Sequence, residues 1–296
     1  MNLDFWIDPW RSVTSICLVV TAAFTAIACG LPGSFLVLRR MSLAGDAISH
    51  SVLPGIVVGF LIAGSLDSPW LIAGAALSGW LTVMAIELLH RRGGVREDAA
   101  TGVVFTAMFS IGVVLLRLFA SKVDLDPDCV LFGNLETAVH GSQIAIGNLA
   151  VPTIVLLTGS TALLAIAFVT LLYHRLLSTS FDPSLAKLTA QSPALSQSIL
   201  LAVTAAVVVA AFQTVGAIMS VALLVLPAAT CLLITRRLSH LLLGVIIHGF
   251  LSAMGGLYLA TWLNCNLGAS VILAGATLFI ACLLRFKRPT SVIKQL

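Results

Sequence analysis

Charged residues are scarce in this chain of 296 residues. Asp, Glu, Lys and Arg make up 9% of it, whereas a typical soluble domain carries about 25%. Hydrophobic residues make up 59%, and the mean hydropathy is +1.09. Twelve acidic and sixteen basic residues are too few to cover the surface of a protein of 31.0 kDa. The composition excludes a water-soluble globule and predicts one transmembrane domain over residues 1–296.

Several sequence signatures of enzymes are also missing. There is no GxxxxGK[ST] phosphate loop, no HExxH and no GxSxG elbow, so the chain lacks the P-loop route to ATP hydrolysis and the signature of a zincin-type protease. The six cysteines form no CxxC pair, which argues against a disulfide framework or a thiolate metal site. A net charge of +4 gives no argument for nucleic acid as a partner. The polar residues that are present suit translocation of a small cation better than covalent catalysis.

Apolar runs recur along the whole chain, and about 20 helical residues are needed to cross the hydrocarbon core of a membrane. Nine candidate spans lie at residues 12–38, 42–65, 69–90, 99–119, 151–173, 194–211, 216–235, 240–262 and 268–284. The predicted fold class is all-α and polytopic, with about nine transmembrane helices. The stretch from His140 to Pro152 fits either an interfacial helix or the tilted start of the fifth span.

The basic residues indicate which side of the membrane each connection faces. With nine spans, thirteen of the sixteen Lys and Arg residues fall on one side, and seven of the twelve acidic residues fall on the other. By the positive-inside rule the basic side is the cytoplasm. We therefore expect the N-terminus outside and the C-terminus in the cytoplasm.

Ionisable side chains inside a span are costly and are candidates for function. Asp46 and His50 lie four residues apart in the second span, so both belong to one helix face. There a carboxylate oxygen and an imidazole nitrogen can together ligate a divalent transition-metal ion. From the residues alone, an internal ion pair, or a contact of Asp46 with Arg39 or Arg40, fits equally well. His248, alone among apolar neighbours, is more typical of a packed histidine, with metal ligation as the second interpretation.

Two segments outside the spans are long enough to matter. Residues 121–136 form an acidic outer loop in this topology, and charge alone favours a solvated turn. Residues 174–193 lie on the cytoplasmic side, with a helix start at Asp182 and apolar residues behind it. Such a short amphipathic helix lies against the membrane or docks in a groove of a partner. The sequence leaves both interpretations open.

Four segments resemble, in order and spacing, the permeases of ABC importers for manganese, zinc and iron. They are GSFLVLRRMSLAGDAISHSVLPGIVVGFL (33–61), REDAATGVVFTAMFSIGVVLL (96–116), DLDPDCVLFGNL (124–135) and VGAIMSVALLVLPAATCLL (215–233). The first closely resembles the signature of this family, and the resemblance covers nearly the whole chain. The four segments together are far more specific than any one of them.

The resemblance implies a type II ABC importer-like permease in the bacterial inner membrane. Such permeases pair with a second copy or with a related permease, bind a separate cytoplasmic ABC ATPase, and receive metal from an extracytoplasmic solute-binding protein. No cofactor is expected to be bound permanently, and ATP acts through the partner subunit. Asp46 and His50 match positions at which relatives place metal ligands along the pathway, which implies a transit site.

The resemblance also implies a role for the segment 174–193, because Phe181, Asp182 and Ala186 lie where relatives present a coupling helix to the ATPase. The expected function is import of a divalent transition-metal ion by alternating access, with manganese favoured and zinc or iron as alternatives. A transit site should be weak and sparse, because a closed cage of ligands would trap the ion.

One segment departs from the family. Many relatives read SYxLDxPxG where this chain reads ATWLNCNLG at 260–268, with Asn264 at the acidic position. The change puts in doubt a role for this loop in metal entry, and the same role is open for the acidic loop 124–136. The change is also compatible with a non-identical permease partner.

Two other functions stay open. One is a permease for a metal chelate of the siderophore or cobalamin type, and the other is an intramembrane metalloenzyme, which needs a third ligand such as His248.

Overall fold

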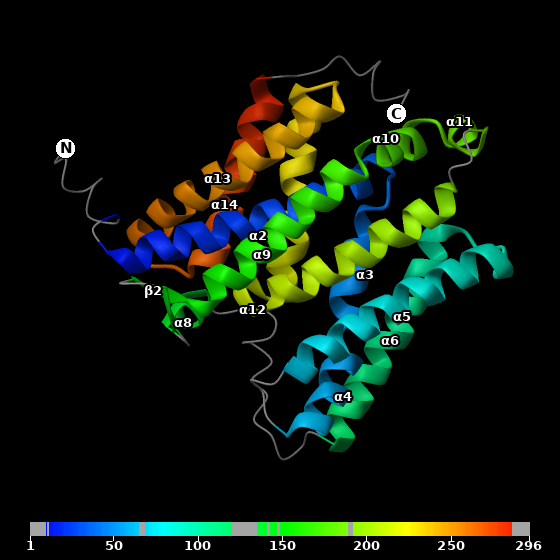
Figure 1. The fold of residues 1–296 in the computed structure, drawn as a ribbon, viewed down its shortest axis with the longest axis horizontal. Coiled ribbons are helices and arrows are strands. Elements are labelled where there is room, and N and C mark those ends of the chain that lie inside the picture. Colours follow the sequence, from blue (N-terminus) through cyan, green and yellow to red (C-terminus); the bar gives the residue numbers. More distant parts are fainter. Residues whose placement is uncertain are drawn as a thin grey trace.

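The structure is a computed structural model that describes residues 10, 12–64, 69–119, 135–140, 143–146, 149–188 and 192–285. The elements, with the labels of Figure 1, are α2 Val13–Leu38, α3 Ser42–Ser51, α4 Leu53–Ala63, α5 Pro69–Gly93, α6 Glu97–Phe119, α8 Leu135–His140, β1 Gln143–Ile146, β2 Leu149–Pro152, α9 Thr153–Leu171, α10 Tyr173–Phe181, α11 Pro183–Leu188, α12 Pro193–Ile234, α13 Leu238–Leu263 and α14 Leu267–Arg285. The described chain is helical apart from one short hairpin, so the all-α class is confirmed.

The polytopic membrane fold is confirmed by the lengths of the helices. Within the described residues, eight helical segments are long and apolar enough to cross a membrane, with α3 and α4 taken together as Ala44–Ala63 and the first half of α12 as Pro193–Phe212. The second half of α12, Met219–Ile234, is a shorter apolar helix. That shorter helix corresponds to the predicted span 216–235. The predicted span 42–65 is divided between α3 and α4, because Pro54 has no N–H to donate to the carbonyl of His50 one turn earlier.

A kink at Gly216 divides α12 into its two halves. The backbone of Gly216 has φ 75° and ψ 175°, a conformation that glycine adopts readily and other residues avoid. Two of the predicted spans therefore lie in one continuous element, on either side of this residue (Figure 1).

Helix α2 is the central helix of the main group, which also contains α9, α12, α13 and α14 (Figure 1). Small side chains line it, and Ala22, Ala26 and Cys29 are almost completely buried. A Cβ at Gly33 would collide with the backbone carbonyl of Leu224 in α12. The backbones of α2 and α12 therefore touch, as small residues allow in membrane helix bundles.

A second group contains α3, α4, α5 and α6, and it packs against α12. Gly55 of α4 and Gly74 of α5 face each other so closely that a Cβ on either would collide with the other's carbonyl. Helix α6 packs against both α3 and α4. Figure 1 shows this group, in blue and cyan, on the opposite side of α12 from α13 and α14.

The segment after α8 is a β-hairpin, so both helical predictions for it are wrong. Strand β1 pairs antiparallel with β2, with Gln143 opposite Pro152 and Ile146 opposite Leu149. Ile144 and Ile146 alternate along β1, and such β-branched residues favour strands. The two residues between the strands are Gly-Asn, which is a typical sequence of a two-residue hairpin turn.

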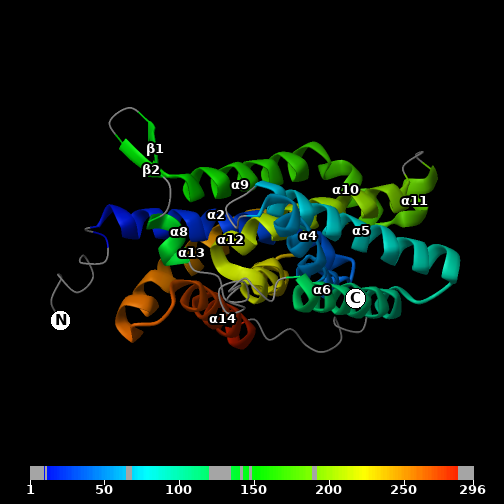
Figure 2. The same ribbon diagram turned by 90° about the horizontal axis from the view of Figure 1, so that it is seen from below.

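Two of the connections expected in the cytoplasm lie at one end of the molecule. Helices α10 and α11 and the turn between α5 and α6 lie at the same end in both views, opposite the start of α2 and the hairpin (Figures 1 and 2). This arrangement agrees with the predicted grouping of the basic connections, and the assignment of this end to the cytoplasm stays a prediction.

Candidate metal centre

Helix α3 begins directly after a tight turn at the end of α2. Arg39 is the C-cap of α2, and Arg40 follows with a φ of 62°. The N–H of Met41 donates to the carbonyl of Leu36 at 2.8 Å, and the N–H of Arg40 donates to that of Val37 at 3.1 Å. These are the two hydrogen bonds of a Schellman motif. The turn therefore fixes the start of α3 against the core helix α2.

Helix α3 places Asp46 and His50 on one face, one helical turn apart. His50 Nε2 lies 3.5 Å from Asp46 Oδ1. The side chain of His50 is 28% exposed and that of Asp46 is 48% exposed, although both residues lie in the candidate span Ala44–Ala63. The structure thus brings together the two residues predicted as ligands, at an open surface within a membrane span.

The remaining faces of α3 are buried against neighbouring helices. Ala44, Ala47 and Ile48 are nearly inaccessible, and Gly45 packs against the side chain of Leu224 in α12. Ser49, also buried, donates its hydroxyl to the carbonyl of Gly45 at 2.9 Å. Packing on these faces holds the rotation of the helix, so the direction of the face that carries the pair is fixed.

Two phenyl rings of α6 surround the imidazole of His50. The ring centroid of His50 lies 5.5 Å from that of Phe105 and 5.8 Å from that of Phe109. The His50 and Phe109 planes meet at 83°, an edge-to-face arrangement that aromatic rings favour. These contacts limit the orientations of the imidazole and keep Nε2 near Asp46.

One carboxylate and one imidazole supply two ligands of types that divalent transition-metal ions accept. Among the described residues, no three or more His, Cys, Asp and Glu side chains come close enough together to hold a metal ion. The pair therefore leaves most coordination positions to water or to a partner, which suits a passing ion better than a permanent one. Within the same residues, the metalloenzyme alternative finds no third protein ligand.

His248 lies apart from this pair, in α13, and is only 5% exposed. Its Nε2 is 3.2 Å from the hydroxyl of Thr230 in α12, and its Nδ1 is 3.3 Å from the hydroxyl of Ser252 one turn further along α13. On another side, a Cβ at Gly275 of α14 would lie 3.2 Å from its Cε1. Both ring nitrogens have hydroxyl partners inside the protein, which favours a packed histidine over a metal ligand.

The predicted coupling segment folds as α10 and α11, joined at Asp182. Oδ1 of Asp182 accepts hydrogen bonds from the backbone N–H groups of Ser184 at 3.1 Å and Leu185 at 2.9 Å, which is the pattern of a helix N-cap. The helix start predicted at Asp182 is therefore present. Ala186 is fully buried, whereas Phe181 is 58% exposed, so the segment presents an aromatic side chain outward.

The residues considered for metal entry are described only in part. The acidic loop 124–136 lies almost wholly outside the described residues. Asn264 ends α13 with a φ of 50°, a left-handed conformation that asparagine tolerates better than most residues. The side-chain oxygen of Asn266 accepts from the N–H of Ala269 at 3.3 Å at the start of α14. Capping of helix ends accounts for both asparagines, with Asn264 at the end of α13 and Asn266 at the start of α14.

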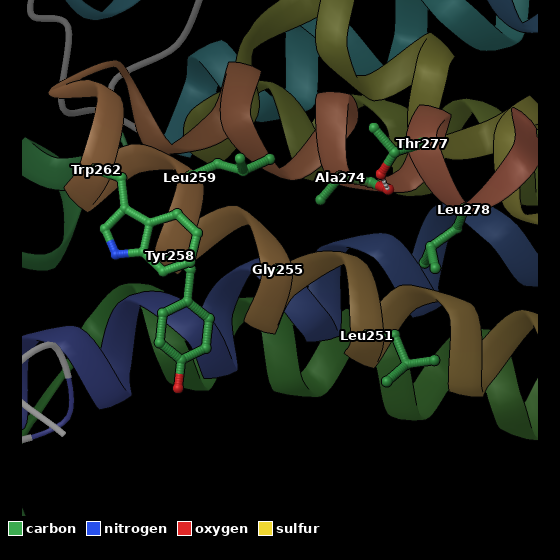
Figure 3. Close-up of a pocket in the computed structure, with 8 residues that line it drawn as sticks. All are labelled: Leu251, Gly255, Tyr258, Leu259, Trp262, Ala274, Thr277 and Leu278. Carbon is green, nitrogen blue, oxygen red and sulfur yellow. Dashed lines mark hydrogen bonds between the residues drawn. The ribbon is translucent and has the colours of Figure 1, made fainter. Parts of the chain in front are cut away.

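A cavity of about 370 Å³ lies between α13 and α14 (Figure 3). Its lining is apolar apart from Tyr258, Trp262 and Thr277, and it includes no carboxylate or imidazole. The hydroxyl of Tyr258 accepts a hydrogen bond from the indole N–H of Trp10 at 2.8 Å. The ring of Tyr258 also makes contacts with the rings of Trp10 and Trp262, and the cavity is not a candidate for a metal ion.

The sequence did not predict which residues of other helices contact His50 and the coupling segment. Phe105 and Phe109 lie four residues apart, a spacing that places both rings on one face of α6 but does not show that this face meets His50. Arg39 donates to Ser180 and Thr179, which are 141 and 140 residues away in the chain. No sequence signal indicated that contact.

Comparison with known proteins agrees with these observations. Residues 15–285 match the ABC 3 transport family. The chain is 38% identical over 259 residues to the manganese transport system membrane protein MntD of Bacillus subtilis, covering 87% of this chain and 88% of that protein. It is 39% identical over 210 residues to the zinc transport system membrane protein TroD of Treponema pallidum, covering 71% and 57%. The solved structure of PsaBC from Streptococcus pneumoniae in complex with Fab is similar with a TM-score of 0.76 and 29% identity, covering 96% of this chain and 95% of that chain. Because the family match takes in nearly the whole chain, this protein belongs to the ABC 3 transport family.

Proposed function

We propose that this chain is the membrane-spanning permease subunit of an ABC importer that carries a divalent transition-metal ion into the cytoplasm by alternating access. Membership of a transport family makes it a transport subunit and not an enzyme. Relatives named for manganese, zinc and iron transport support a metal ion as the cargo. Manganese is favoured, because a carboxylate suits Mn²⁺ and a manganese transport protein is similar over most of the chain.

The observation that carries the proposal is the exposed Asp46–His50 pair on the otherwise buried helix α3. The two side chains already converge, with 3.5 Å between Nε2 and Oδ1, so a divalent ion can bind both without moving the helix. Two ligands hold such an ion weakly enough for it to leave. In this proposal Asp46 and His50 are the ligands of the transit site, and the buried His248 is not a ligand.

The chain works with several partners in this proposal. A separate cytoplasmic ABC ATPase hydrolyses ATP and docks on α10 and α11, where Phe181 is exposed, Asp182 caps α11 and Ala186 packs inward. An extracytoplasmic solute-binding protein delivers the ion. A second copy or a related permease completes the pathway, facing the exposed side of the Asp46–His50 pair. The N-terminus then lies outside and the C-terminus in the cytoplasm.

Uptake of radioactive manganese, zinc and iron by cells that produce the complete importer tests the proposal. Asp46→Ala and His50→Ala should each lower uptake at least about tenfold, since even the outer-shell partners of metal ligands are worth 10- to 100-fold. Membrane levels of the permease and its copurification with the ATPase should stay normal. Manganese should support uptake at the lowest concentration.

His240→Gln is the matched control, because it removes an exposed histidine at the start of α13. It should transport at the parent rate. If Asp46→Ala and His50→Ala assemble normally and also transport at the parent rate, the pair is not the transit site. If none of the three ions is taken up by the parent importer, the proposed cargo is wrong.

A further inference from the structure

Arg39 connects the end of α2 to the proposed coupling segment. Its Nε donates to the hydroxyl of Ser180 at 3.0 Å, and its Nη2 donates to the hydroxyl of Thr179 at 2.9 Å. Both acceptors lie in the last turn of α10, directly before Phe181 and Asp182. A guanidinium that reaches two neighbouring hydroxyls with two donors holds its partner in one orientation, which a single flexible donor does not.

The hydroxyl of Thr179 is a junction between three helices. It is buried, it donates to the carbonyl of Arg175 at 2.7 Å, and it lies 3.1 Å from the hydroxyl of the buried Ser196 near the start of α12. Because the hydroxyl proton of Thr179 points to the backbone carbonyl of Arg175, both lone pairs of the oxygen can accept hydrogen bonds, one from Arg39 and one from the hydroxyl of Ser196. A displacement of α10 is therefore transmitted to α2 and α12 together.

The other end of this connection leads directly to the metal pair. Arg39 is the last residue before the Schellman turn, and Asp46 follows seven residues later, in the second turn of α3. The N–H of Arg40, in the turn, donates to the carbonyl of Val37 at 3.1 Å, which ties the turn to the last turn of α2. Met41 is buried, and its N–H is hydrogen-bonded to the carbonyl of Leu36, so the turn moves together with α2.

We propose that Arg39 is a positioning residue for transport, which transmits movement of the α10–α11 coupling segment to the turn before α3 and thereby to Asp46 and His50. This inference rests on the proposed function, because it assumes that α10 and α11 contact the ATPase and that the pair binds the transported ion. It adds the physical link between them, through the hydroxyls of Thr179 and Ser180.

The complete importer in proteoliposomes tests the link, with uptake of radioactive manganese and ATP hydrolysis measured on the same sample. In Arg39→Gln, the number of ions taken up per ATP hydrolysed should fall at least about fivefold, the lower end of typical coupling between two sites, while ATP hydrolysis per complex continues. Arg39→Lys keeps the charge but not the two-pronged donor, and its ratio of ions to ATP should lie between those of the parent and of Arg39→Gln. Ser180→Ala leaves Arg39 in place and should also lower the ratio.

The double variant Arg39→Gln/Ser180→Ala should be no worse than Arg39→Gln alone, because both changes break one connection. The matched control is Arg92→Gln, which removes an exposed arginine at the end of α5 and should keep the parent ratio. If Arg39→Gln does not assemble, Arg39→Lys and Ser180→Ala decide the question.

Three results overturn the link: a parent ratio in all Arg39 and Ser180 variants, equal falls of uptake and ATP hydrolysis, or additive losses in the double variant. A lower ratio in Arg92→Gln overturns the link too, because the loss of any positive charge at this end of the molecule would then lower the ratio. Failure of the transit site gives a different pattern, in which Asp46→Ala and His50→Ala transport at the parent rate whatever Arg39 does.

Discussion

His50 in α3 and His248 in α13 both lie within membrane spans, but their surroundings differ in the number of protein partners. His248 is 5% exposed and has a hydroxyl within 3.3 Å of each ring nitrogen. His50 has a side chain that is 28% exposed, with a carboxylate 3.5 Å from Nε2 and phenyl rings at its sides. The protein satisfies the first imidazole, and it orients the second toward an opening.

The difference shows how one residue type serves packing in one place and a site in another. A buried polar group must be hydrogen-bonded by the protein, and His248 meets this requirement with Thr230 and Ser252. Around His50 the neighbours are apolar rings, which restrict orientation but occupy no lone pair. We therefore expect substitutions near His248 to change stability, and substitutions near His50 to change transport.

The largest expected effect comes from replacing each histidine in turn. His50→Ala should lower manganese uptake about tenfold or more with little change in the apparent Tm of the purified complex. His248→Ala should retain uptake per folded molecule but lose about 2–4 kcal/mol of stability, because it leaves a cavity and two hydroxyls without their partner. Uptake normalised to permease amount and thermal unfolding in detergent measure both. The opposite pattern would reverse the two roles.

The next effect concerns the rings that orient His50. Phe109→Ala removes the edge-to-face contact and should lower uptake about two- to tenfold, the equivalent of an aromatic pair, because the imidazole then samples other orientations. Phe109→Tyr keeps the ring and should stay near the parent rate. Phe119→Ala, an exposed residue at the end of α6, is the control. Equal loss in the Phe109 and Phe119 variants would mean that His50 does not depend on this ring.

The Asp46–His50 pair could be predicted from sequence because its geometry is local. A spacing of four residues places two side chains on one helix face whatever the rest of the fold does. The N-cap role of Asp182 is local in the same way. The partners Phe105, Thr230 and Thr179 come from other helices, so they depend on packing that periodicity does not encode.

The spans were predictable for a similar reason, since length and apolar composition define a transmembrane helix. The hairpin after α8 was not, because a short apolar stretch such as 143–152 fits a helix or a strand equally well by composition. Its Gly-Asn pair was the available signal. The kink of α12 coincides with Gly216 and separates two runs whose boundary the sequence already indicated.

A smaller effect is expected from filling the space beside His248. A Cβ at Gly275 would lie 3.0 Å from Leu226 Cδ2, 3.1 Å from Ser252 Oγ and 3.2 Å from His248 Cε1. Gly275→Ala should therefore cost about 1 kcal/mol, since overpacking outweighs the better helix propensity of alanine. At Gly102 in α6 nothing lies within 4 Å of a Cβ, so Gly102→Ala should be neutral or stabilising. Apparent Tm values compare the two, and a destabilised Gly102→Ala with an unchanged Gly275→Ala would contradict the tight packing.

The smallest expected effect concerns the turn before α3, which carries His50, and the turn after α13, which carries His248. Arg40 before α3 has φ 62° and Asn264 after α13 has φ 50°, but the left-handed conformation costs arginine more than asparagine. Arg40→Gly should relieve strain and raise the apparent Tm by about 1–2 °C, part of the gain being offset by the greater freedom of glycine in the unfolded chain. Asn264→Gly should change it less. A lower Tm for Arg40→Gly would mean that the exposed side chain of Arg40 stabilises the turn that leads into the site by more than its backbone strain costs.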